Sequence, residues 1–260
     1  SNTNFPEYNV LDRLRVVAIR TDKPEVAEGD TVVVTPLISD AQGNGRALTF
    51  SAAGCTDPGL SDVSYENCDS AGVRAELGSG AVGAIGVLNR TYTDVAPSLN
   101  VTIPAGTITS GTTGSYLVTY RVSAADGTHV DAIKRIVVSK QARRNTNPSI
   151  SKILAENSAL SFAPTLSTFP AGQTRLNIEM GTGSSETYPS ISSDGSVLTR
   201  TETITLTWFI TDGSNKYQRT LIQDTNLWTP PSAKPASRGI ALIVVARDGR
   251  GGEDFKQIEF

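Results

Sequence analysis

The chain has 260 residues, of which 38% are hydrophobic and 19% are charged, together with 23 glycines and 13 prolines. This length exceeds that of one β-sandwich and suits two, and the composition excludes a disordered chain. The formal net charge of −3 excludes a strongly basic protein, so neither nucleic acid nor an anionic lipid surface is expected as a partner.

Residues 1–9 precede the first predicted domain. The chain opens Ser-Asn-Thr-Asn without a Met and without an export signal, which we interpret as a trimmed start. Predictions about export therefore depend on features further along the chain.

Residues 10–140 are predicted to form the first sandwich domain. Short Val- and Ile-rich runs alternate there with Gly, Asp, Asn and Pro, a spacing typical of antiparallel β-sandwiches. No window combines a 3.6-residue period with a plausible cap, which disfavours parallel α/β folds. The fold class is therefore predicted to be all-β. Strands are expected at residues 13–20, 31–39, 47–52, 82–90, 99–103, 115–123 and 133–139.

The loop at residues 40–45 resembles the beginning of a calcium-binding loop. Its oxygen-bearing side chains Asp40, Gln42 and Asn44 stand at alternate positions, and a glycine stands sixth. However, Ser51 occupies the position where a bidentate Glu closes such a loop. The alternative is a plain turn between strands, and no other cofactor is expected. A structural calcium ion between the domains is a second alternative, with Asp126, Asp131 or Asp248 as ligands.

Two cysteines, Cys55 and Cys68, are separated by a loop rich in turn residues, without a third or fourth metal ligand nearby. We predict a disulfide, because closing a loop of roughly 15 residues removes about 3 kcal/mol of unfolded-chain entropy. A disulfide implies an oxidising compartment outside the cytoplasm. The alternative is a pair of free thiols in a cytosolic protein.

Two patterns that often mark enzymes are present only in part. Residues 78–83 fit the spacing of a dinucleotide-binding loop, but the alternating polarity before them and Gly86 after them favour a glycine-rich strand or turn. His129 is the only histidine, and no Gly-x-Ser-x-Gly elbow accompanies it, so it is expected at the surface of a hairpin. The chain is therefore predicted not to be an enzyme.

Residues 141–148 are predicted to be a polar linker, followed by a second sandwich domain at residues 149–260. Residues 117–138 and 240–260 both contain an apolar strand that runs into Ala-x-Asp-Gly and a return strand. Asp-Gly between such strands is a strong hairpin signal, because Gly supplies the positive φ of the turn. The two matching ends indicate a duplicated sandwich.

In the predicted second domain, the side chains of Ile204, Leu206, Trp208 and Ile210 share one strand face, so Trp208 is expected in the core. The longest apolar run, residues 239–246, is far shorter than the ~18 residues of a membrane span and fits one buried strand.

Three aromatic residues lie at or near segments that contain Pro or Gly, where a ring can face solvent and stack on a sugar. They are Tyr188, Tyr217 and Trp228. They support an alternative function as a carbohydrate-binding module, while the competing interpretation places Trp228 as a plug in the open end of the sandwich.

Five stretches of the chain share a pattern with one family. They are Arg15-Val-Val-Ala-Ile-Arg20, Glu25-Val-Ala-Glu-Gly29, Trp208-Phe209, Asn226-Leu-Trp-Thr-Pro230 and Arg247-Asp-Gly-Arg-Gly-Gly252. With them, the chain resembles the predicted surface or outer-membrane lipoproteins common in delta-proteobacteria, which carry immunoglobulin-like sandwich repeats. None of the shared motifs is catalytic.

This resemblance implies an upstream lipid-modified Cys and a short polar tether, so residues 1–9 are predicted to form a flexible N-terminal tether. It also implies a periplasmic or cell-surface location, anchored at the outer membrane. The function predicted from it is that of a non-catalytic exported structural or interaction protein, adhesin-like or part of the envelope. Its expected partner is an unknown protein or glycan at the cell envelope. Contact with the membrane is expected only through the upstream lipid anchor.

Overall fold

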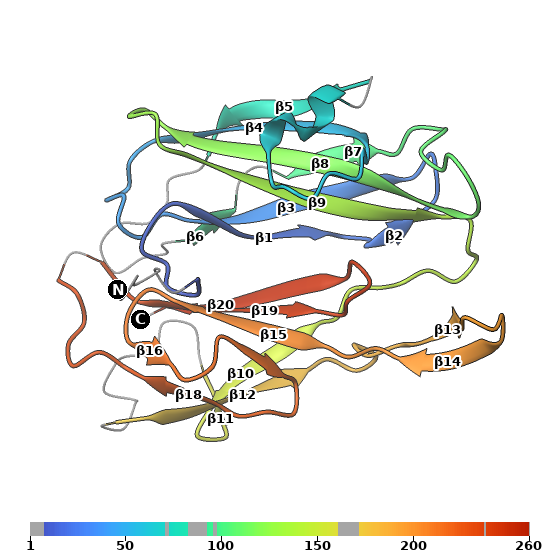
Figure 1. Cartoon of the computed structure of the whole chain (residues 1–260). Coiled ribbons are helices and arrows are strands. Elements are labelled where there is room, and N and C mark those ends of the chain that lie inside the picture. The colour runs from blue at the N-terminus through green and yellow to red at the C-terminus, as the bar shows by residue number, and fades with distance from the viewer. Residues whose placement is uncertain are drawn as a thin grey trace, which may run out of the picture.

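The computed structural model of the protein describes residues 8–70, 73–82, 93–95, 98–160, 172–236 and 238–259. Its strands form sheets that are almost entirely antiparallel, which confirms the predicted all-β fold class. The one helical element in these ranges is the 3-10 helix η1 (Tyr65–Ser70). Figure 1 shows the main sheets stacked in four layers, two from the first half of the chain and two from the second.

The first half, residues 8–139, contains two sheets that pack face to face. One has the order β1-β3-β6, with β7 also paired to β3, and the other has the order β2-β9-β8-β4-β5. Apolar side chains from both inner faces, such as Val34 and Tyr120, fill the space between them. Most of the expected strand at residues 82–90 lies outside the described residues. The strands are β1 (Arg15–Thr21), β2 (Glu25–Val26), β3 (Thr31–Ser39), β4 (Leu48–Thr56), β5 (Ala75–Ala81), β6 (Thr93–Val95), β7 (Leu99–Thr102), β8 (Thr113–Ala124) and β9 (His129–Ser139).

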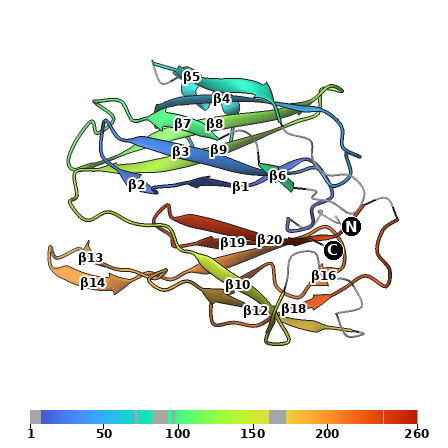
Figure 2. The same cartoon turned by 180° about the vertical axis from the view of Figure 1, so that it is seen from behind.

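The second half, residues 150–259, has two sheets with the orders β11-β10-β12-β18-β16 and β17-β15-β19-β20. A separate two-stranded hairpin, β13-β14, extends beyond the other strands in both views (Figures 1 and 2). The strands are β10 (Ile150–Ala155), β11 (Ser158–Ala159), β12 (Thr174–Met180), β13 (Thr187–Ile191), β14 (Val197–Thr201), β15 (Thr205–Ile210), β16 (Ser214–Asn215), β17 (Arg219–Leu221), β18 (Asn226–Thr229), β19 (Ala241–Arg247) and β20 (Glu253–Glu259).

The two halves repeat one strand order. The sheet β9-β8-β4-β5 corresponds to β20-β19-β15-β17, and β1-β3-β7 corresponds to β10-β12-β18. Both predicted Asp-Gly hairpins are present, since Gly127 and Gly249 have the positive φ values of 90° and 79° that such turns need. The repeated order supports the predicted duplication, while the division into independent domains with a linker at residues 141–148 stays a prediction.

Strand β19 is buried on both faces. Leu242, Val244 and Ala246 point into the core of the second half, whereas Ile243 and Val245 belong to an apolar cluster shared with the first half. Successive side chains of a strand point to opposite faces, so burial of both faces selects a continuous apolar run rather than an alternating one. This explains the unbroken run that the sequence shows at this strand.

Trp208 on β15 is fully buried in the core of the second half, as predicted. Its indole Nε1 donates a hydrogen bond of 2.8 Å to the hydroxyl of Thr220 on the neighbouring strand β17. The ring therefore contributes apolar burial without leaving its polar atom unpaired.

The segment Tyr8–Leu11, called here the N-terminal strap, pairs its backbone with the second half. The amide of Leu11 donates to the carbonyl of Ile210 at 2.8 Å, and the amide of Ile210 donates to the carbonyl of Asn9 at 3.0 Å. Asn9 and Leu11 are both buried. The predicted tether at residues 1–9 is therefore wrong at Asn9, which is buried, whereas Tyr8 is exposed. Residues 1–7 lie outside the described residues.

Candidate functional site

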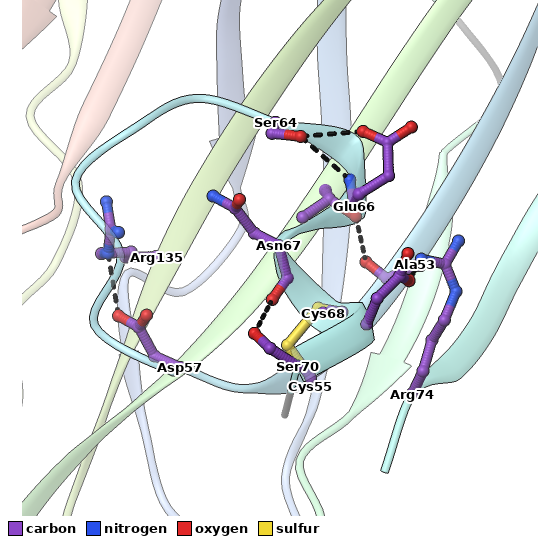
Figure 3. The surroundings of a disulfide bond; sticks show 12 residues. Ala53, Cys55, Asp57, Ser64, Glu66, Asn67, Cys68, Ser70, Arg74 and Arg135 are labelled. Atoms are coloured by element: carbon purple, nitrogen blue, oxygen red, sulfur yellow. Dashed lines mark hydrogen bonds and ion pairs between the residues drawn. A yellow bond between two sulfur atoms is a disulfide. The ribbon is translucent and has the colours of Figure 1, made fainter. Parts of the chain in front are cut away.

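The predicted disulfide between Cys55 and Cys68 is present and joins β4 to η1 (Figure 3). It holds the loop that follows β4 against the outer face of the sheet, where Leu117 is fully buried and Ile133 is partly buried beneath the sulfur atoms. The disulfide thus closes a small apolar cluster that this loop alone covers.

Charged side chains fasten the same loop to the sheet. Arg121 pairs with both oxygens of Asp131 at 2.7 and 2.9 Å, and Asp131 also accepts the amide of Tyr65 at 3.0 Å. Burial raises the pKa of Asp131, but the hydrogen bonds from Arg121 and Tyr65 outweigh it and leave the pKa below its ordinary value. Arg135 pairs with Asp57 at 2.8 Å (Figure 3). These contacts are structural, because each carboxylate is occupied by a neighbouring cation.

The three aromatic residues predicted to bind a carbohydrate do not form one surface. Trp228 is fully buried in the core of the second half, so its predicted role as a solvent-facing platform is wrong. The apolar surface of its ring contributes more when buried than when exposed, and its Nε1 donates to the carbonyl of Asp212 at 3.3 Å. Tyr217 is 45% exposed, and Tyr188 lies half-buried on the separate hairpin.

The loop proposed for calcium is closed by an internal ion pair. The buried carboxylate of Asp40 accepts Arg46 Nε at 2.7 Å and Arg46 Nη2 at 3.0 Å, so both of its oxygens already face a cation. Gln42 and Asn44 are exposed on the turn. The prediction of a calcium loop is therefore wrong for Asp40. Within the described ranges, no three His, Cys, Asp or Glu side chains are grouped to hold a metal ion.

The three aspartates considered for calcium between the domains also accept hydrogen bonds from donors. Asp126 accepts the amide of Thr128, Asp131 is paired as described above, and Asp248 accepts the amide of Gly252. They bind N–H groups of their own surroundings rather than leaving oxygen atoms free to meet at one point.

The glycine-rich segment is a strand, and the histidine lies on the surface, as expected. Gly78 belongs to β5, where a Cβ would come within 2.9 Å of Leu99 Cδ2, so close packing explains its lack of a side chain. Gly83 lies outside the described residues. His129 begins β9 and is exposed beside the hairpin turn.

The region that does bring distant residues together is the junction between the two halves. An apolar cluster joins Val17, Ala18 and Leu37 of β1 and β3 to residues of the second half. The second half contributes fully buried side chains from its sheet, namely Phe209, Ile243 and Val245. The junction therefore has a core of its own, with Leu11 of the N-terminal strap added at its edge.

Glu253 is the main polar link across this junction. Its Oε1 accepts the amide of Ile19 on β1 at 3.0 Å, and its Oε2 accepts Arg247 Nε at 2.8 Å. Only 7% of its side chain is exposed, so this carboxylate is paired with donors from both halves in a largely dry environment. The carboxylate of Glu253 thus holds β1 in one position relative to β20.

Arg250 forms a second polar group, which we call the Arg250 cluster. Its Nη1 donates to the fully buried carboxylate of Glu202 at 2.7 Å, and its guanidinium lies 4.2 Å from the ring centre of Tyr188. Glu25 of the first half and Glu186 stand 3.9 Å from it. One cation thus stands among carboxylates from both halves, in the turn of the β19–β20 hairpin.

Two asparagines of the predicted linker complete these contacts. Asn145 is buried, and its amide side chain donates to Asp248 Oδ2 at 2.7 Å. Asn147 donates to the carbonyl of Thr21 at 2.7 Å and accepts the amide of Glu253 at 3.0 Å. The sequence interpretation as a solvated linker missed these roles. The available signal was the pair of amide side chains at alternate positions before Pro148.

A cleft of about 400 Å³ opens at the junction between strands β1 and β9. Its walls include Lys134 of the first half and Arg247 and Glu253 of the second. A neighbouring cleft of about 330 Å³ continues along β9 to Arg135 and Gly249. Lys134 Nζ donates to the carbonyl of Gly251 at 3.0 Å. Burial lowers the pKa of Lys134, and this effect exceeds the opposing attraction of nearby carboxylates such as Glu253.

None of the helices in the described ranges has the length and apolar character needed to cross a membrane. No protein-family model matches the chain, and no curated protein does. Among solved structures, the chain is similar to a YadV chaperone, with 8% identity, a TM-score of 0.31, and coverage of 93% of this chain and 99% of that one. It is also similar to Salmonella alpha-2-macroglobulin reacted with methylamine, with 9% identity, a TM-score of 0.29, and coverage of 95% of this chain and 16% of that one. At these TM-scores, neither likeness bears on function.

Proposed function

We propose that this protein is a non-catalytic, exported structural or interaction protein of the cell envelope, in which two β-sandwich halves act as one rigid body. The observation that carries this proposal is the junction, where buried apolar and charged side chains of both halves are paired with one another. Relative motion of the halves would expose Phe209 and Ile243 to water and would leave Glu253 without the amide of Ile19.

Rigidity follows from the character of the contact. Interfaces between domains of one chain are usually polar, and motion between such domains is the default unless the interface is large and hydrophobic. Here the outer face of β19 is as completely buried as its inner face. Glu25 of the first half adds contacts that depend on one orientation of the halves, since its carboxylate accepts the amide of Asn145 and lies 3.9 Å from the guanidinium of Arg250.

Export is supported by the disulfide, since such bonds persist in oxidising compartments. A lipid anchor at the outer membrane remains an expectation from the family resemblance. An interaction role without catalysis is supported by the pairing within the cleft, where Glu253 is held by Arg247 and Asp131 by Arg121. These carboxylates are engaged in ion pairs rather than poised as acid or base.

Two measurements test the proposal. In the natural host, cell fractionation and thiol alkylation of the full-length gene product should find it in the envelope with Cys55 and Cys68 oxidised. A reduced protein in the cytoplasm would refute export. In solution, NMR relaxation should give both halves one rotational correlation time, and residual dipolar couplings should fit one alignment tensor. Independent tumbling of the halves would refute the rigid-body part.

A further inference from the structure

Strand β9 has one open edge, and the pairing with β8 identifies it. The amide of Ala124 bonds to the carbonyl of Thr128, so the residues of β9 at even positions exchange hydrogen bonds with β8. The amides and carbonyls at odd positions therefore point away from β8. The amide of Val137 confirms this direction, since it donates to the carbonyl of Pro24 on the other side.

Three successive outward positions of β9 remain open beyond this contact. The backbone groups of Asp131, Ile133 and Arg135 have no hydrogen-bond partner within the ranges that the structure describes. All three residues line the two adjoining clefts. An unpaired strand edge that faces a cleft is a template for an added strand.

On the facing edge of β1, two outward backbone groups have hydrogen-bond partners. The outward amide of Ile19 is taken by Glu253, and the outward carbonyl of Thr21 is taken by Asn147. The second half and the linker thus occupy two outward groups of β1 but none of these three positions of β9. The edge of β9 is therefore the one that offers successive open groups to an incoming segment.

The charge of the cleft indicates what kind of segment fits. Glu253 is neutralised by Arg247, and Asp131 is neutralised by Arg121. Lys134 is half-buried, and its Nζ donates to a carbonyl, that of Gly251, so its charge has no carboxylate within hydrogen-bond distance among the described residues. A buried charge is stabilised by an ionic partner, which an acidic side chain would supply.

We propose that the cleft binds an extended, acidic peptide segment of a partner protein, added as a strand to β9 with a carboxylate side chain next to Lys134. Alternate side chains of the added strand face the inside of the cleft, where Lys134 lies. The others face outward toward Val63, which is 56% exposed at the rim. This proposal rests on the proposed interaction function. It specifies the kind of partner segment that the cleft at the junction binds.

The probe is a fluorescein-labelled peptide of eight alternating valines and threonines with one central glutamate on the inward face. We expect saturable binding to the whole protein by fluorescence anisotropy. In NMR, the amides of Asp131, Ile133 and Arg135 should gain protection from hydrogen exchange. Two control peptides are tested against the same wild-type protein. N-methylation of alternate backbone amides should abolish binding, and glutamine in place of glutamate should weaken it about tenfold.

Variants of the protein test the same contacts from the other side. Ile133→Pro removes an outward amide that takes no part in the β8 ladder, and it should reduce binding more than tenfold, whereas Ile133→Val should not. Lys134→Gln should abolish the preference for glutamate over glutamine, and Lys134→Arg should keep it. The matched control is Lys152→Gln, which changes an exposed lysine on β10 and should leave binding unchanged.

The proposal is overturned if the glutamate peptide shows no binding at millimolar concentration, or if N-methylation leaves its affinity unchanged. Equal affinity of the glutamate and glutamine peptides for the wild-type protein would also overturn it. These outcomes are separate from the tests of the proposed function, because fractionation, thiol state and tumbling are measured without a peptide. A protein that is exported and rigid but ignores the peptide refutes this inference alone.

Discussion

The two halves share a strand order but cover the outer faces of their corresponding sheets in different ways. In the first half, Leu117 on β8 is covered by the loop that the Cys55–Cys68 disulfide holds down. In the second half, Ile243 and Val245 on β19 are covered by β1 and β3 of the first half. The sheet that is covered by a short loop has a disulfide that holds this loop in place. The sheet that is covered by the neighbouring sandwich has no such bond among the described residues.

The same difference explains the two sequence patterns. The outer positions of β8 pass from Leu117 through Thr119 to Arg121, so this strand becomes polar where charged side chains bind the covering loop. The outer positions of β19 stay apolar from Ala241 to Val245, because the neighbouring sheet extends over all of them. One topology therefore carries two hydrophobic patterns, each set by what lies outside the sheet.

Replacement of Phe209 should give the largest loss of stability, since it removes apolar packing between the two halves. Phe209 is fully buried at the junction, and Phe209→Ala should lower the free energy of unfolding by about 3–5 kcal/mol. Urea denaturation followed by circular dichroism measures this loss. Val197→Ala, at a side chain 67% exposed on the β13–β14 hairpin, should change stability by less than about 0.5 kcal/mol. Equal effects of the two would contradict a packed junction.

Removal of the disulfide tests the cover of the first half. The double variant Cys55→Ala, Cys68→Ala should lose about 3 kcal/mol, as expected for a closed loop of roughly 15 residues. Amide exchange should accelerate more at Leu117 than at Ile243, because only the former lies under the released loop. Reduction of the wild-type protein serves as the control and should reproduce the same pattern. Equal acceleration of amide exchange in both halves would show that the disulfide-held loop does not protect the first half specifically.

Loss of the central cation should come next in size. Arg250→Met leaves the fully buried carboxylate of Glu202 without its ionic partner and should destabilise the protein by about 2–3 kcal/mol, less than for a fully dry pair because Arg250 is 24% exposed. Arg175→Met provides the comparison, since that arginine is 62% exposed in its pair with Glu156 and should cost less than about 1 kcal/mol. A double-mutant cycle with Glu202→Gln should recover part of the Arg250→Met loss.

The smallest expected effect is a pH dependence carried by Glu202. Burial raises its pKa above the ordinary value of 4.5, and this outweighs the hydrogen bonds from the Glu186 amide and Arg250 that lower it. The folded state therefore binds this proton more tightly than the unfolded chain does. The resulting stabilisation is fully present below pH 4.5 and is lost as the pH rises through the folded pKa. Urea titrations of the wild type and Glu202→Gln at successive pH values should give a stability difference that falls over this window. A difference that rises with pH would contradict the burial of Glu202.

The sequence predicted local structure well, because its signals are local. Alternation around Trp208 indicated a core face, the Asp-Gly pairs indicated both hairpins, and Cys55 and Cys68 indicated their own bond. Each of these features depends on the spacing of residues within one strand, turn or loop.

The junction was not predictable in the same way. Glu253 accepts the amide of Ile19, 234 positions away, and the carbonyl of Arg250 accepts the side chain of Asn145, 105 positions away. Spacing within a segment does not report such contacts. The same reason accounts for the errors at Asp40 and Trp228. A carboxylate in a turn can bind an ion or an arginine, and an aromatic residue beside prolines can face water or the core. Tertiary packing selects between these outcomes.

The N-terminal strap has a mechanical consequence. The described part of the chain begins on β15, through the bonds between Asn9, Leu11 and Ile210, and its last strand is β20 of the same sheet. Tension applied between these two points would pass along the strand order from β15 across β19 to β20, without crossing the sheets of the first half. The second half would act as the force-bearing part of the molecule, and the sandwich with the disulfide would remain outside the line of force.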